Sequence, residues 1–135
     1  MSGLVLLYQN DFSNKGVKVK YITKEQADLK HGDNYSKLVF AENINMYSDK
    51  SLVQMIIIEP KTDVASHYHE KTTEIFYFLS GVGTFIVDGK SIICEPGSIL
   101  ICEPGEKHPV KNDSDEPWKY LAFKTYQEGG DSIWD

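Results

Sequence analysis

The sequence predicts an all-β fold, a sandwich or barrel built from many short strands. Three observations support this prediction. Short apolar and β-branched segments follow one another closely from residue 50 onward, turn signals rich in Pro, Gly and Asp separate them, and only one short segment has the features of a helix. The length of 135 residues fits a single domain, and 41% hydrophobic with 25% charged residues is ordinary for a soluble globular protein.

The N-terminal part is predicted to contain two strands and one helix. The strands are expected over residues 17–22 and 37–41. Between them, Thr23 can act as the N-cap of a helix of about two turns, with Gln26 at the capping-box position and Gly32 at the end.

The central and C-terminal parts are predicted to form a series of strands joined by tight turns. Asp88-Gly89 between two β-rich segments indicates a two-residue hairpin. The pentapeptide ICEPG occurs twice, and its Pro-Gly pairs suit two type II turns. The strands expected here cover residues 51–59, 74–79, 84–87, 90–94, 98–102 and 118–126.

We expect one structural domain in three parts. Residues 1–50 would form the N-terminal strands and the short helix, which pack on a barrel. Residues 51–126 would form the barrel core, and residues 127–135 would form a C-terminal tail.

The charge pattern argues against nucleic-acid and membrane-surface binding. The formal net charge is −6, and no basic patch is visible in the sequence. The chain contains no arginine, so a phosphate or carboxylate ligand would have to be held by lysine, backbone N–H groups or a metal. No apolar segment is long enough to span a membrane.

The two cysteines, Cys94 and Cys102, are expected to be buried and reduced, with a thiolate ligand or a redox role as alternatives. The first residues lack a basic segment and a long apolar segment of the kind found in secretory signals. We therefore expect a cytoplasmic protein.

Three histidines and one glutamate form a candidate metal-binding set. His67 and His69 lie two residues apart, so on a strand their side chains point to the same face. Glu74 opens the next strand, and His108 follows the second Pro-Gly turn. Three nitrogen donors and one oxygen donor suit Fe, Mn, Ni, Co or Zn better than Ca or Mg.

These residues lie in two motifs that resemble those of the cupin superfamily, of the small single-domain type. The first is His67-x-His69-x4-Glu74-x6-Gly81, and the second is Gly97-x5-Glu103-Pro104-Gly105-x2-His108-x3-Asn112. The chain departs from the family pattern at two turn positions, where Lys61 replaces a glycine and Glu103 replaces a proline. All four positions that bind metal in the family are occupied by residues able to do so.

The resemblance implies a double-stranded β-helix, the cupin jelly-roll barrel, with one divalent transition metal in its mouth. It also implies open coordination positions at the metal, which are typical of catalytic sites. Cupins include dioxygenases, isomerases, epimerases, decarboxylases and lyases as well as proteins that only bind a small ligand, so the fold does not name the reaction.

The wall of a substrate pocket is expected to contain inward-facing side chains from three strands. Strand alternation places Phe76 and Phe78 on the same face as Glu74, with Tyr68 and Tyr77 facing away. Phe76 could equally be pocket wall or plain core, whereas plain core is favoured for Phe78. Lys124 could be an anchor for an anionic substrate, but a surface lysine is favoured. The candidates are Met55, Ile57, Phe76, Phe78, Tyr120 and Lys124.

The resulting hypothesis is a metal-dependent enzyme that acts on a small metabolite chelating the metal, of either dioxygenase type or isomerase and lyase type. The apolar candidates in the pocket wall favour the oxygenase type. The alternative is a non-catalytic cupin that binds or senses a sugar or a small acid. Apolar residues 4–8 and Trp134 near the chain ends suggest a homodimer in which these ends dock. Asn112 is expected to bond to backbone, and His31 to lie on the surface.

Overall fold

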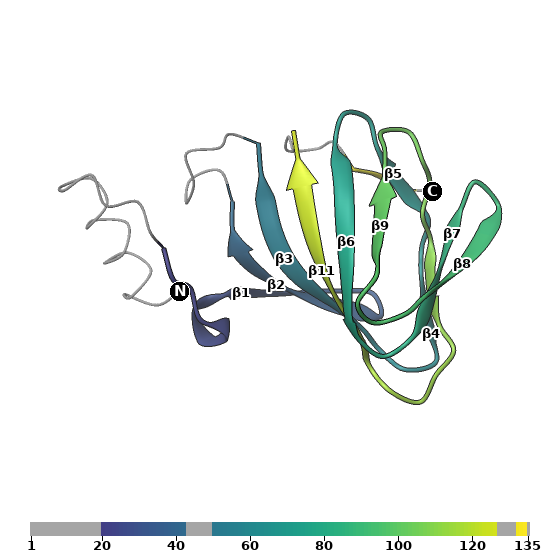
Figure 1. Ribbon diagram of the computed structural model, residues 1–135, viewed down its shortest axis with the longest axis horizontal. Coiled ribbons are helices and arrows are strands. Elements are labelled where there is room, and N and C mark those ends of the chain that lie inside the picture. Colours follow the sequence, from purple (N-terminus) through teal and green to yellow (C-terminus); the bar gives the residue numbers. More distant parts are fainter. Residues whose placement is uncertain (1–19, 43–49, 127–131, 135) are drawn as a thin grey trace.

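The computed structural model describes residues 20–42, 50–126 and 132–134, and it is built almost entirely from antiparallel strands (Figure 1). A six-stranded sheet has the order β1-β2-β3-β11-β6-β9, a four-stranded sheet has the order β4-β10-β7-β8, and β12 pairs with β5. The elements are η1 (Lys24–Gln26), β1 (Asp28–Gly32), β2 (Tyr35–Ala41), β3 (Leu52–Ile58), β4 (Thr62–Val64), β5 (His67–His69), β6 (Thr73–Ser80), β7 (Gly83–Val87), β8 (Lys90–Cys94), β9 (Ile99–Cys102), β10 (Val110–Asn112), β11 (Trp118–Thr125) and β12 (Ser132–Trp134).

The strands predicted from residue 37 onward are confirmed to within two residues at their ends, because local turn chemistry marks their limits. Asp88 and Gly89 both have positive φ angles, 50° and 78°, as a type I′ hairpin turn between β7 and β8 requires. Gly97 and Gly105 have φ angles of 88° and 87° at the third position of their turns, as type II geometry requires.

The predicted N-terminal helix is wrong in its extent. Only a 3-10 helix over η1 is present, and the residues from Asp28 to Gly32 form β1 instead. Asn34, with a φ angle of 71°, forms the turn that leads into β2, and β1 gains a full ladder of backbone hydrogen bonds there. A tertiary strand pairing therefore overrides a weak local helix signal. Of the strand predicted over residues 17–22, residues 20–22 are not strand and the rest lies outside the described residues.

The core fills the space between the two larger sheets. Trp118 is fully buried and stacks on Phe78, while Phe85 from the facing sheet meets both rings. Gly83 makes room for this packing, because an added Cβ would lie 2.1 Å from the Trp118 ring. This aromatic layer adjoins the site described below, since Phe85 also stacks on His108.

Asn112 of the second motif holds the β3–β4 turn and the β10–β11 loop together. Asn112 is fully buried, and its amide nitrogen donates to the carbonyl oxygens of Ile58, Glu59 and Glu116 at 2.9–3.2 Å. This confirms the expected structural role of Asn112. Lys61, where the family has glycine, has a φ angle of 56°, so the turn keeps the left-handed backbone that a glycine would adopt without strain.

The described residues include no helix with the length and apolar character needed to cross a membrane. The predicted docking segment at residues 4–8 lies outside the described residues.

Candidate metal centre

The four predicted ligand residues come together at one end of the barrel interior. Strand alternation places His67 and His69 of β5 on one face, while Glu74 lies at the start of β6 and His108 follows the Pro104-Gly105 turn. Each residue contributes one possible ligand atom, and these four atoms all lie within 4.8 Å of one another. The group can therefore hold a metal ion.

Backbone hydrogen bonds fix the distance between the two motifs. The amide of His108 donates to the carbonyl oxygen of His67 at 3.1 Å, and the amide of Gly105 donates to that of His69 at 2.7 Å. The loop carrying His108 is therefore tied directly alongside β5. The donor of the second bond, Gly105, is the positive-φ glycine of the Pro104-Gly105 turn.

Hydrogen bonds to the outer ring nitrogens orient two of the imidazoles. His108 Nδ1 lies 2.9 Å from the carbonyl oxygen of Glu106 and can only donate to it, which leaves His108 Nε2 as a lone-pair donor facing the site. His69 Nδ1 lies 3.2 Å from the hydroxyl oxygen of Ser132, and His69 Nε2 lies 3.0 Å from Glu74 Oε1. Such outer contacts are typical of metal-ligating histidines.

Two buried ring nitrogens support a metal at this position. His67 Nδ1 and His108 Nε2 are buried and have no hydrogen-bond partner within the described parts of the chain. A buried polar atom without a partner is costly, and coordination of a cation would satisfy both atoms. The donor set and these two atoms fit the divalent transition metal that the fold implies.

The electrostatics of the site favour the ligand forms of its residues. Burial, and after it the neighbouring His108 imidazole, lower the pKa of His67 from 6.5 to about 3, so the His67 imidazole is neutral at neutral pH. Burial would raise the pKa of Glu74, but the imidazoles of His108 and His69 and the charge of Lys124 hold it well below the usual range. Burial raises the pKa of Cys102 to about 12, so this thiol stays protonated. Cys94 and Cys102 are both buried and free, as predicted.

The C-terminal strand β12 lies against the metal-binding strand. It pairs with β5 over three residues, and the Trp134 ring stacks on the His67 ring with 4.3 Å between centroids. Trp134 packs on its own His67 and is still 48% exposed, so its docking on a second copy stays a prediction. The homodimer itself stays a prediction.

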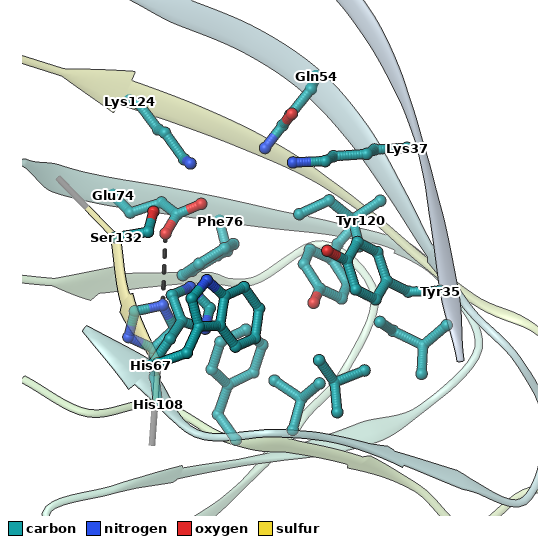
Figure 2. A pocket seen from close by; sticks show the side chains of 16 residues that line it. Tyr35, Lys37, Gln54, His67, Glu74, Phe76, His108, Tyr120, Lys124 and Ser132 are labelled. Atoms are coloured by element: carbon teal, nitrogen blue, oxygen red, sulfur yellow. Dashed lines mark ion pairs between the residues drawn. The ribbon is translucent and has the colours of Figure 1, made fainter. Parts of the chain in front are cut away.

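A cavity extends from the metal centre between the sheets (Figure 2). It holds about 540 Å³ of empty space, a figure that includes its open mouth. Of the predicted wall residues, Phe76, Tyr120 and Lys124 line it. Phe78 is not part of the lining and lies in the aromatic core instead.

The placement of Met55 and Ile57 in the wall is corrected by the register of β3. Ile56 pairs with Tyr120 and Gln54 pairs with Ala122, so the even-numbered residues of β3 face the interior. The lining residues from this strand are Gln54, Ile56 and Ile58, while Met55 and Ile57 lie on the other face.

Several polar lining residues were missed by the sequence analysis. Tyr35, Lys37 and Gln54 line the cavity, as do Ser132 and Trp134 of β12. Burial and nearby Lys124 lower the pKa of Lys37, and burial and Glu74 raise the pKa of Tyr120. Strand alternation could not predict which way Lys37 faces. The next two residues, Leu38 and Val39, are both apolar and both buried, one on each face of the strand.

The chain is similar to known proteins in sequence and in fold. Residues 54–124 match the family model described as Cupin domain. An oxalate-binding protein of Thermotoga maritima is 30% identical over 77 residues, and the match covers 57% of this chain and 64% of that protein's length, which is less than two thirds.

Two solved structures show the same fold. One is described as a predicted oxalate decarboxylase from Thermotoga maritima, with a TM-score of 0.71, 22% identity and coverage of 78% of this chain and 98% of that one. The other is an uncharacterized conserved protein with a double-stranded β-helix domain from Klebsiella pneumoniae, with a TM-score of 0.70, 19% identity and coverage of 86% and 96%. The match to the cupin family model covers more than half of this chain, and the fold agrees with it. The chain therefore belongs to the cupin family.

Proposed function

We propose that the chain is a metal-dependent enzyme that binds one divalent transition metal through His67, His69, Glu74 and His108. The substrate would be a small metabolite that coordinates the same metal. The observation that carries this proposal is the convergence of four ligand atoms within 4.8 Å at the head of a cavity. A divalent metal held there supplies Lewis acidity to a coordinated oxygen atom.

The polar cavity wall favours isomerase or lyase chemistry over the oxygenase chemistry that we expected from an apolar wall. Tyr35 and Tyr120 have raised pKa values because they are buried, so both phenols are protonated at neutral pH and can donate hydrogen bonds. Lys37 and Lys124 bring positive charge to the same cavity. These groups can orient a substrate, hold a proton near it and counter negative charge that develops during reaction.

A second candidate function is binding of a small acid without catalysis. The Thermotoga maritima relative is named for binding oxalate. All four candidate ligand residues of this chain lie within residues 54–124, the part that matches the cupin model. A carboxylate is also an oxygen ligand that suits the proposed metals. Small acids are therefore the first ligands to test under either function.

Elemental analysis of the protein tests the metal centre. Protein purified without chelators or a metal-affinity column, both in air and without oxygen, is expected to hold one transition metal per chain. His69→Ala should lower this occupancy at least tenfold while circular dichroism shows that the strands remain. His31→Ala is the matched control, because His31 is exposed on β1. Full occupancy in His69→Ala would refute the assignment of the ligands.

Product analysis then separates the two functions. The metal-loaded protein is incubated with small acids and sugars, and the mixtures are followed by NMR and by oxygen uptake. Conversion without oxygen uptake supports the isomerase or lyase proposal, and conversion with oxygen uptake supports the dioxygenase type. Saturable binding with no conversion supports the non-catalytic alternative.

A further inference from the structure

Three polar side chains form a diagonal line across the inner face of the six-stranded sheet. Lys37 of β2 pairs with Ile56, Gln54 of β3 pairs with Ala122, and Lys124 of β11 pairs with Glu74. Lys37, Gln54 and Lys124 are thus diagonal neighbours on adjacent strands, with about 7–8 Å between successive positions. Lysine side chains are long enough to bring both ammonium groups over Gln54.

The three side chains enter the cavity from the wall opposite the histidines. Figure 2 shows Lys37 and Lys124 reaching into the cavity from opposite sides, with Gln54 between them and Glu74 next to Lys124. The line therefore begins beside the metal centre and leads away from it.

Gln54 is the strongest sign that this wall serves a ligand. Its side chain is 2% exposed, yet its Oε1 atom has no hydrogen-bond partner among the described residues. The buried amide of Asn112, by comparison, is bonded at both ends. A buried amide oxygen without a partner costs free energy, and because it can only accept, a water or a lysine ammonium would have to satisfy it. The amide nitrogen of Gln54 is then the group that can donate to a bound anion.

The ammonium groups of Lys37 and Lys124 also lack polar partners among the residues that the structure describes. Both are half-buried, and within the described ranges neither makes a salt bridge or a side-chain hydrogen bond. Their like charges oppose each other across a cavity where the nearest carboxylate, Glu74, already lies against two imidazoles. An anion between the lysines would remove this repulsion.

We propose that Lys37, Lys124 and Gln54 form an anion subsite, and that the ligand is a small dicarboxylate with one acidic end on the metal and the other on this subsite. The proposal deepens the proposed function and rests on it for the metal-bound end. Because the chain has no arginine, lysine is the side chain available for a buried carboxylate. The distance along the diagonal favours a diacid with a spacer, such as succinate, over oxalate.

Calorimetric titration of the metal-loaded protein tests the subsite. The probes are succinate, oxalate, acetate and the uncharged succinamide. Succinate should bind at least tenfold more tightly than acetate or succinamide, and Lys37→Met or Lys124→Met should each remove at least tenfold of the succinate affinity while acetate affinity stays unchanged. Gln54→Leu should also lower the affinity for succinate.

Lys119→Met is the matched control, because Lys119 lies on the same strand as Lys124 but on the opposite face, paired with Ile57. It should leave succinate binding unchanged. Metal stoichiometry is measured for every variant, since Lys124 is the direct neighbour of Glu74 across the strands. Wild-type succinate affinity in Lys37→Met and Lys124→Met with intact metal content would overturn the subsite.

Failure of the proposed function gives a different pattern. If the wild-type protein binds no metal, succinate is titrated into the metal-free protein and followed by NMR of the lysine side chains. Shifts at Lys37 and Lys124 that Lys119 does not share would support the subsite alone. Absence of such shifts would overturn it.

Discussion

Replacement of Ser132 by alanine is expected to weaken metal binding although Ser132 is not a metal ligand. The Ser132 hydroxyl lies 3.2 Å from His69 Nδ1, and it is the side-chain partner of the ring nitrogen that faces away from Glu74. When His69 Nδ1 donates its hydrogen to this hydroxyl, the lone pair of the imidazole is on Nε2, the atom that faces the site. Ser132→Ala removes the hydrogen-bond acceptor that favours this tautomer of His69.

The expected magnitude follows from the geometry of that contact. Loss of a hydrogen-bond partner behind a ligating histidine typically costs 10–100-fold in metal affinity, or about 1.4–2.7 kcal/mol. The 3.2 Å distance is at the long end for a hydrogen bond, and Ser132 is exposed, so water can partly take its place. We therefore expect the low end, a loss of about tenfold.

Competition with a chromogenic chelator for Zn²⁺ or Co²⁺ measures this change. Ser132→Thr keeps a hydroxyl and should retain most of the affinity. Ser98→Ala is the matched control, because the Ser98 hydroxyl donates to the Glu95 carbonyl oxygen in an exposed turn. An unchanged dissociation constant for Ser132→Ala, or an equal loss for Ser132→Thr, would show that the hydroxyl does not orient His69.

Four further outcomes are expected. Asn112→Ala should lower the free energy of unfolding by about 2–4 kcal/mol in urea titrations, because it leaves buried carbonyl oxygens without donors, whereas Thr62→Ala, which removes one exposed bond to Glu59, should cost less than about 1 kcal/mol. The metal-free protein should lose stability as pH falls from about 6.5 toward about 3, because His67 binds its proton only in the unfolded chain over that range; stability that rises on acidification would contradict the lowered pKa. Cys94→Ser combined with Cys102→Ser should leave metal content unchanged, since neither thiol belongs to the ligand group, and a loss of metal would assign a thiol to the site. Light scattering should give about twice the chain mass of 15.3 kDa, because apolar side chains of β6 and β9 are exposed on the outer face of the sheet, and a mass of one chain would refute the homodimer.

Features set by neighbouring residues could be predicted from the sequence. The Asp88-Gly89 hairpin and the two Pro-Gly turns depend on which residues tolerate positive φ angles, and the structure has positive φ angles at Asp88 and at the three turn glycines. The shared face of His67 and His69 follows from the two-residue period of a strand.

The facing of β3 could not be predicted, because its hydrophobic pattern does not alternate. Its residues are apolar on both faces, with Met55 and Ile57 on the outer face and Ile56 and Ile58 on the inner face. The one polar residue, Gln54, faces the cavity, which reverses the usual rule that polar residues face solvent. The pocket wall was therefore assigned to the wrong residues of this strand.

The sequence by itself determined that this chain has an all-β cupin fold and which four residues can hold a metal, because strand alternation, turn geometry and ligand chemistry are all properties of short segments. Only the tertiary structure decided what surrounds that centre. The pairing of β12 with β5 joins residues more than sixty positions apart, and the diagonal of Lys37, Gln54 and Lys124 depends on the registers of three strands. Such contacts depend on the packing of the whole barrel, so they cannot be predicted from a local sequence pattern.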